Sequence, residues 1–347
     1  MLDCMRAVRI HQHGGPEVLR DEAAPEPALA PDEVRVRVRA CALNHLDLFI
    51  RAGIPAVPIA LPRILGSDIA GELAATGEPV LVAPGIGCGL CRSCLGGRDN
   101  ECRHYQVFGY QRDGGYAEFV AVPRRALLPM PAGLDFAQAA SMPLVFLTAW
   151  NMLVRRARIS PGQTVLVWAA SSGVGMAAIQ IAKLFGCRVV ATAGSPAKLD
   201  LARALGADAV VDHYDPARPV SRAVKDFAPE GVDVVVEHVG QASWEQSLRS
   251  LAPNGVLVTC GATTGHVANI DLRFLFSRQL RLLGSYMGRR ADLDAIVPLI
   301  AQGRLRAVVD RVFPLADAAA AHAYLGEGKQ FGKVVLDVDR SPFTGHR

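Results

Sequence analysis

The chain contains no uninterrupted apolar run as long as the about 18 residues that a transmembrane helix needs. It contains no block of clustered basic residues with interleaved aromatics, and aromatic residues make up only 6% of it. Its first ten residues, MLDCMRAVRI, lack the apolar segment of a signal peptide. These absences argue against a membrane protein, a nucleic-acid-binding protein and an exported protein. The expected location is the cytoplasm.

The cysteines are few and unevenly placed. Of the eight in 347 residues, four crowd into the stretch GIGCGLCRSCLGGRDNEC, and the others stand singly in apolar segments. In a reducing compartment, clustered cysteines indicate metal or redox chemistry rather than a disulfide framework. The clustered residues are Cys88, Cys91, Cys94 and Cys102.

The spacing C-x2-C-x2-C-x7-C is typical of thiolates that wrap one tetrahedral ion. Four sulfurs leave no open position for water or substrate, so such a zinc would be structural. An iron–sulfur cluster is the competing interpretation, because C-x2-C-x2-C also opens the bacterial ferredoxin run. That run continues with x3-C-P, whereas Cys102 comes after seven residues and is followed by Arg103. We therefore predict one structural zinc in a lobe at residues 85–104.

The length predicts two domains. Residues 1–128 show short strand patterns, as at 33–40, 79–85 and 114–123. From residue 129 the pattern becomes helical, with Asp135 as a helix cap, and then apolar strands alternate with helices, which indicates a buried parallel sheet. A final strand at 331–338 suggests that residues 289–347 complete the first domain. The predicted fold class is a two-domain α/β protein, with a β-rich domain and a doubly wound parallel-sheet domain at 129–288.

The segment TVLVWAASSGVGMAAIQIAK reads as strand, tight turn and helix. Glycines in such a turn let the backbone approach a pyrophosphate, whose charge is met by the helix N-terminus. The first glycine of the G-x-G-x-x-G fingerprint is replaced here. The turn nevertheless predicts a dinucleotide site at Ser172, Gly173, Val174 and Gly175.

The end of the next strand, at residues 191–195, has no acidic residue. NAD sites usually place an Asp or Glu there to bind the ribose hydroxyls. Here Ser195, Lys198 and His213 lie nearby instead. A lysine attracts a 2′-phosphate and a missing carboxylate does not repel it, so we predict NADPH rather than NADH. The alternative is that Lys198 is an ordinary solvated helix residue.

With these residues in place, the chain resembles the medium-chain dehydrogenase/reductase superfamily of zinc alcohol dehydrogenases and quinone oxidoreductases. The resemblance runs from MRAVRIHQHGGPEVL through the four-cysteine lobe and SMPLVFLTAW to FGKVVLDV. It implies a GroES-like catalytic domain with an inserted Rossmann domain. It also implies a homodimer or a dimer of dimers, with the strand in RLLGSYMG pairing across a two-fold axis.

The departures from the alcohol dehydrogenase pattern concern the catalytic zinc. Where that pattern has a cysteine ligand, a histidine ligand and a later ligand, this sequence has Asn44, Ser67 and the ligand-free segment 140–144. Leu46 stands where the proton-relaying hydroxyl would be. An amide and a hydroxyl do not make a zinc site, although Asp68 and His45 remain candidate ligands of a second ion. The resemblance is to the quinone oxidoreductase branch, which works without catalytic zinc.

The expected reaction is hydride transfer from NADPH to an activated alkene or a quinone, a small carbonyl-conjugated substrate whose developing enolate needs only hydrogen bonds. We expect Asn44 near the nicotinamide as an amide donor, Asp47 as a carboxylate that holds local geometry, and Tyr110 as a candidate proton donor. His45 is expected to face the pyrophosphate. The other residues expected to line the coenzyme cleft are Thr148, Gly240, Gly261, Gly284 and Ser285.

Two further hypotheses stay open at this point. One is a zinc-dependent alcohol dehydrogenase with unusual catalytic ligands, which would hold two zinc ions per chain instead of one. The other is a non-enzymatic NADPH-binding protein, which would bind the coenzyme without turnover. Fold alone does not decide among the three.

Overall fold

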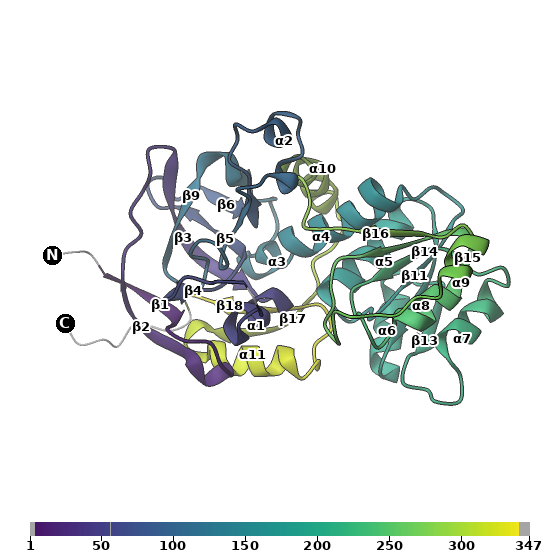
Figure 1. The fold of residues 1–347 in the computed structure, drawn as a ribbon. Coiled ribbons are helices and arrows are strands. Elements are labelled where there is room, and N and C mark those ends of the chain that lie inside the picture. Colours follow the sequence, from purple (N-terminus) through teal and green to yellow (C-terminus); the bar gives the residue numbers. More distant parts are fainter. Residues whose placement is uncertain (1–3, 56, 340–347) are drawn as a thin grey trace. The chain divides into compact units, whose positions relative to one another are not determined.

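A computed structural model describes residues 4–55 and 57–339 (Figure 1). The chain divides into two compact units, one made of the residues up to Leu144 and from Arg289 onward, the other of Val145–Gly288. The first boundary lies 16 residues beyond the predicted one at 128/129. The reason is that helix α3 (Phe136–Ala140) packs against strands β3 (Glu33–Ala42) and β5 (Asp68–Leu73) of the first unit. The change in local pattern after residue 129 therefore precedes helix α3 of the first unit and does not mark the start of the second unit.

The first unit is built on a seven-stranded sheet of order β10-β6-β5-β3-β18-β17, with β9 paired to β3. Strand β18 (Lys333–Asp337) pairs antiparallel with β3, so Val335 lies opposite Ala42. The end of the described chain therefore sits inside the sheet, and purple and yellow elements share this unit in Figure 1. The remaining strands of this sheet are β6 (Pro79–Val82), β9 (Phe119–Pro123), β10 (Leu127–Pro129) and β17 (Val309–Pro314).

Smaller elements complete the first unit. Strand β1 (Cys4–Ile10) pairs with β2 (Leu19–Pro25) and β4 (Arg63–Ile64), and β7 (Gly85–Ile86) pairs with β8 (Gln106–Val107). Its other helices are α1 (His45–Ala52), α2 (Arg92–Leu95), α10 (Arg290–Ala301) and α11 (Ala318–Gly326).

The strand predicted at 114–123 is shorter in the structure, because β9 begins only at Phe119. An added Cβ at Gly114 would lie 2.1 Å from the Gly66 carbonyl oxygen, and one at Gly115 would lie 2.8 Å from the Cys41 sulfur. The two glycines thus let this segment pass close to the backbone before β9 instead of joining the sheet.

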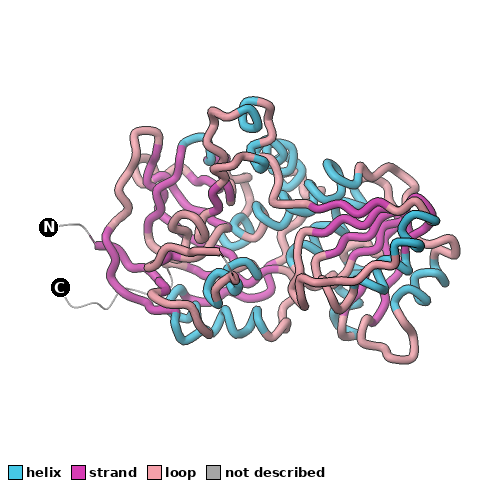
Figure 2. The backbone as a smooth tube through the Cα atoms, in the orientation of Figure 1, coloured by secondary structure: helices cyan, strands magenta, loops and turns pink. Residues whose placement is uncertain are grey.

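The second unit is a six-stranded sheet in which every neighbouring pair is parallel. Its order is β13-β12-β11-β14-β15-β16, which in chain order is the 3-2-1-4-5-6 of a Rossmann fold. Figure 2 shows these strands running side by side in magenta. The strands are β11 (Thr164–Val167), β12 (Arg188–Ala193), β13 (Ala209–Asp212), β14 (Val232–Glu237), β15 (Leu251–Thr259) and β16 (Arg281–Gly284).

The helices of the second unit are α5 (Gly173–Leu184), α6 (Pro196–Ala204), α7 (Val220–Phe227), α8 (Trp244–Ser250) and α9 (Leu272–Ser277). Ser195 is the N-cap residue of α6, and Gly206 follows the end of this helix with a φ of +106°.

One helical stretch of the described chain, Phe136–Ala157, is long and apolar enough to cross a membrane. It joins α3, α4 (Pro143–Trp150) and a π-helical turn at Asn151–Ala157. Its most apolar window is 83% buried, as expected of a core helix. Asp135 caps its start as predicted, accepting the backbone N–H of Gln138 at 2.7 Å.

Candidate functional site

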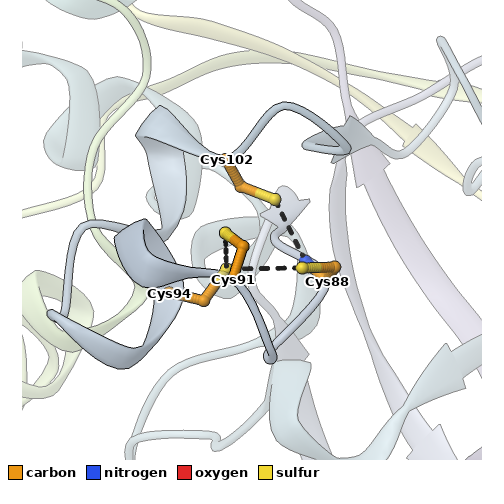
Figure 3. A group of neighbouring side chains, drawn as sticks. All are labelled: Cys88, Cys91, Cys94 and Cys102. Carbon is orange, nitrogen blue, oxygen red and sulfur yellow. Dashed lines mark hydrogen bonds between the residues drawn. The ribbon is translucent and has the colours of Figure 1, made fainter.

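The four clustered cysteines come together in one place. Their sulfurs lie within 4.8 Å of one another, with 3.6 Å from Cys91 to Cys94 and 4.0 Å from Cys88 to Cys94 (Figure 3). Four sulfurs bound to one tetrahedral zinc at about 2.3 Å are about 3.8 Å apart, so the spacing fits such an ion. All four are free thiols in the structure.

The backbone around the cluster stabilises thiolate. The Cys102 sulfur accepts the backbone N–H groups of Cys88 and His104 at 3.4 Å and 3.3 Å. The backbone N–H groups of Leu90 and Cys91 lower the pKa of Cys88 to about 6, whereas desolvation raises the pKa of Cys94 to about 12. Four thiolates at this separation therefore need a cation to balance them, which is the chemistry that Zn²⁺ supplies.

A second polar cluster is buried in the first unit and contains Asn44, Asp68 and Lys333. The Lys333 ammonium donates to Asn44 Oδ1 at 2.6 Å and to Asp68 Oδ2 at 2.8 Å. The Asn44 side-chain N–H donates to the same Asp68 oxygen at 2.9 Å. The side chains of Lys333 and Asp68 are 2% and 0% exposed, so this ion pair is closed to water.

This cluster decides whether Asp68 can bind a second zinc. Its Oδ1 accepts the backbone N–H of Leu144 at 2.7 Å, and its Oδ2 already has two donors. Ser67 is fully buried and donates its hydroxyl to the Phe108 carbonyl at 2.7 Å. Asp68 is therefore already engaged through both oxygens and paired with Lys333, and the other groups of this donor set are an amide and a hydroxyl, which do not fit a catalytic zinc.

Asp47 joins the start of α1 to the loop before β5. Its two oxygens accept the backbone N–H groups of Asn44 at 2.7 Å and Gly66 at 3.0 Å. Complete burial raises its pKa to about 7, while these N–H groups and Lys333 act in the opposite direction. A carboxyl in this position fixes the backbone of Asn44, in keeping with the geometric role expected of it.

The raised pKa of Asp47 predicts a pH-dependent stability. A carboxyl whose pKa is about 7 when folded and about 4 when unfolded stabilises the fold fully below pH 4. This contribution, on the order of 4 kcal/mol, is lost as the pH rises from 4 to 7. We expect the free energy of unfolding of wild type, measured relative to that of Asp47→Asn in urea titrations, to fall by about 4 kcal/mol over this range. A difference that stays constant with pH would contradict the assignment.

Tyr110 and His45 are the other two residues expected near the reaction site or the coenzyme. Tyr110 is half-buried in the turn after β8, and burial raises its pKa. Within the described residues, no hydrogen bond joins it to Asn44 or Asp47. His45 begins α1 and lies 6.4 Å from the Phe49 ring, centroid to centroid. A different tyrosine, Tyr116, is fully buried, and its hydroxyl lies 3.0 Å from His322 Nε2.

The glycine-rich turn of the second unit follows β11 as predicted. Ser172 is the N-cap of α5, and its hydroxyl accepts the Gly175 backbone N–H at 2.9 Å. An added Cβ at Gly175 would lie 2.3 Å from the Ala169 carbonyl oxygen, so the helix can approach the strand only with glycine there. Gly173 and Val174 form the first turn of this helix, whose N–H groups are available to an anion.

A histidine that the sequence analysis did not identify lies beside this turn. His238 follows β14, and its Nε2 lies 3.0 Å from the Trp168 carbonyl oxygen and 3.4 Å from the Ser172 hydroxyl. Because a carbonyl only accepts, Nε2 carries the hydrogen. Burial lowers the pKa of His238, so the ring is neutral at pH 7.

The residues predicted to select the coenzyme gather at the ends of β12 and β13. His213 Nδ1 lies 3.1 Å from the Thr192 hydroxyl, and burial together with the nearby Lys198 lowers its pKa. Its ring meets Tyr214 edge to face at 4.5 Å. Tyr214 is 75% exposed, although sequence reasoning did not single it out. The sequence feature that could have identified Tyr214 is its position directly after His213, at the end of β13.

The remaining residues expected to line the coenzyme cleft differ in their backbone conformation, in the space around their Cα atoms and in their hydrogen bonds. Gly240 has a φ of +96°, and a Cβ there would lie 2.6 Å from the Gly265 carbonyl oxygen. A Cβ at Gly261 would lie 2.9 Å from the His238 carbonyl oxygen, whereas one at Gly284 would meet nothing within 4 Å. Thr148 is buried in α4, and Ser285 accepts the Asn151 side-chain N–H at 2.9 Å.

Two family descriptions match the chain. The alcohol dehydrogenase GroES-like domain matches residues 30–132, and the zinc-binding dehydrogenase family matches residues 173–302. Among curated proteins, a quinone oxidoreductase of Pseudomonas aeruginosa is 34% identical over 342 residues, covering 95% of this chain and 99% of the relative.

Two solved structures extend the comparison. The crystal structure of an NAD-dependent alcohol dehydrogenase is 44% identical with a TM-score of 0.93, covering 96% of this chain and 100% of that one. A 2-octenoyl-CoA carboxylase reductase, solved with NADP and 2-octenoyl-CoA, is 28% identical with a TM-score of 0.88, covering 99% and 90%.

Proposed function

Since this chain belongs to the medium-chain dehydrogenase/reductase superfamily and is an NAD(P)H-dependent oxidoreductase of it, we propose that it reduces activated alkenes or quinones. The specific substrates would be enones, enals or quinones, and the coenzyme NADPH. A zinc ion held by the four-cysteine lobe would be structural and take no part in the reaction.

The observation that carries this proposal is the closed ion pair of Lys333 and Asp68. It engages Asp68, the carboxylate nearest to the expected position of a catalytic zinc in sequence, and both carboxylate oxygens accept hydrogen bonds. Without a Lewis acid, the alkoxide of a saturated alcohol lacks stabilisation. An enone needs less, because the charge that develops on its oxygen is held by hydrogen bonds alone.

The bound coenzyme would supply a hydride, which forms a C–H bond at the β-carbon of the enone while the alkene π electrons move toward the carbonyl oxygen. In the proposed reaction the Asn44 amide donates an N–H to that oxygen. A proton from water or a side chain then completes the α-carbon, so one NADPH and one proton are consumed per alkene reduced.

The relatives support this chemistry by their names. The similar P. aeruginosa protein is a quinone oxidoreductase, and the 2-octenoyl-CoA carboxylase reductase was solved with an alkene conjugated to a thioester. That structure also contains NADP, in line with Ser195, Lys198 and the absence of an acidic residue at 191–195.

An alcohol dehydrogenase remains the second candidate, because the 44% identical structure bears that name and names NAD as its coenzyme. Metal content separates the two candidates. A catalytic zinc in addition to the lobe zinc would give two ions per chain, whereas the proposed reductase needs one.

The decisive experiment combines a metal count with NADPH and NADH oxidation against a panel of enones, enals and quinones, and NAD(P)⁺ reduction with simple alcohols. We expect one zinc per chain, consumption of NADPH with at least one conjugated acceptor, and no turnover of saturated alcohols. Two zinc ions together with alcohol oxidation would overturn the proposal.

A further inference from the structure

We propose that Lys333 is a positioning residue of the reaction site, whose ammonium group holds the Asn44 amide in the orientation that offers an N–H to the substrate carbonyl. The proposal rests on the proposed function, since it assigns how the donor of that reaction is held. It also gives a reason for the buried lysine at the start of β18, an inner strand of the sheet.

The chemistry of the partners fixes the orientation of the amide. An ammonium group has no acceptor, so the Asn44 atom 2.6 Å from Lys333 must be the oxygen. A carboxylate has no donor, so the Asn44 atom 2.9 Å from Asp68 must be the nitrogen. Reversing the amide would place nitrogen against ammonium and oxygen against carboxylate. The two partners therefore leave one favourable orientation.

Burial distinguishes the members of the cluster. Asp47 and Asp68 are fully buried and Lys333 is 2% exposed, whereas Asn44 keeps 7% of its surface exposed. An amide nitrogen has two N–H groups, and Asp68 takes one of them. Within the described residues the second has no protein acceptor, which leaves it for a bound carbonyl oxygen.

Charge balance alone does not account for this arrangement. Asp68 is neutralised by the contact to Lys333 at 2.8 Å, and nothing in that pairing requires a bond to Asn44. The shorter contact, at 2.6 Å, goes to the asparagine oxygen. Buried ion pairs are moreover often replaceable by neutral groups without loss of stability. A lysine with a positioning role, by contrast, cannot be replaced without loss of activity.

The test compares two variants with wild type. Lys333→Met removes the ammonium but leaves the Asp68 carboxylate unpaired, so this variant is open to misfolding. Lys333→Met combined with Asp68→Asn removes both charges and keeps an acceptor for the Leu144 N–H. The new amide at position 68 then presents its N–H groups to Asn44, which turns its oxygen toward them. The matched control is Lys183→Met, because Lys183 pairs with Asp208 at the surface at 2.8 Å.

For the double variant we expect a melting temperature near that of wild type and a kcat about 100-fold lower, as when a donor is misplaced by about 1 Å. The KM for NADPH is expected to stay unchanged, as is every parameter of the Lys183→Met control. Recovery of wild-type kcat in the double variant would overturn the proposal and leave the ion pair as a structural element.

A second readout needs no substrate. In protein labelled with ¹⁵N at asparagine, the Asn44 side-chain amide signal is identified by its loss in Asn44→Ala. We expect it to shift and exchange faster with solvent when Lys333 is replaced, and to be unaffected by Lys183→Met. An unchanged signal would refute the positioning role whatever the activity. If wild type reduces no acceptor but the Asn44 signal changes when Lys333 is replaced, the proposed substrate class is wrong. The positioning of Asn44 by Lys333 is then still supported.

Discussion

A Cys94→Ser variant is expected to lose the proposed structural zinc ion and to unfold the lobe at residues 85–104. The four sulfurs lie within 4.8 Å of one another, and helix α2 has only four residues, none of them buried. The lobe therefore has little core of its own, so a bound zinc would supply its folding free energy, about 10 kcal/mol or more in small zinc domains. We expect the melting temperature to fall by roughly 10 °C.

Metal content by mass spectrometry and hydrogen exchange of residues 85–104 measure the two effects. Cys187→Ser is the matched control, because Cys187 is a buried cysteine outside the cluster whose thiol donates to the Ser160 carbonyl at 3.4 Å. It should keep one zinc. Full zinc occupancy in Cys94→Ser would show that the four cysteines do not form one tetrahedral site.

Replacing Lys198 with glutamate is expected to shift the coenzyme preference from NADPH toward NADH by about 100-fold. Lys198 follows the end of β12, close enough to His213 to lower its pKa. A hydrogen bond to a charged group contributes about 1.5–3 kcal/mol, and the new carboxylate would repel a 2′-phosphate while accepting from a ribose hydroxyl. The ratio of kcat/KM for NADPH to that for NADH measures the shift.

Lys225→Glu provides the control for the change of charge. Lys225 is exposed on α7 of the same unit, and its replacement should leave the ratio unchanged. A ratio unaltered by Lys198→Glu would assign Lys198 to the solvated helix surface and move the choice of coenzyme to other residues.

Features that depend on neighbours in the chain were predictable from the sequence. Asp135 caps the helix expected of it, because capping uses groups only two or three residues away. The alternation of apolar strands and helices indicated the parallel sheet for the same reason. The four cysteines were also identified correctly as one cluster, since their spacing is local.

Features that depend on distant contacts were not predictable. The first unit extends to Leu144 because α3 packs on strands more than 60 residues earlier. Lys333 was included in a predicted strand, but its burial depends on Asn44, 289 residues away. A lysine in FGKVVLDV has the appearance of a solvent-facing residue, and only its partners show otherwise. Asp68 was considered as a metal ligand because its partner, the Lys333 ammonium, lies 265 residues later in the chain and could not be recognised from the sequence.

The position of β18 between β3 and β17 has a consequence for how the protein is made. Asn44 and Asp68 leave the ribosome 289 and 265 residues before Lys333, and the whole of Val145–Gly288 is synthesised in the interval. The second unit is continuous in sequence and can fold while translation proceeds. The sheet of the first unit cannot be completed before its inner strand β18 has been synthesised. The Asp68 carboxylate has no Lys333 to pair with until then. The proposed reaction site can therefore form only after β18 has been synthesised, later than the whole of Val145–Gly288.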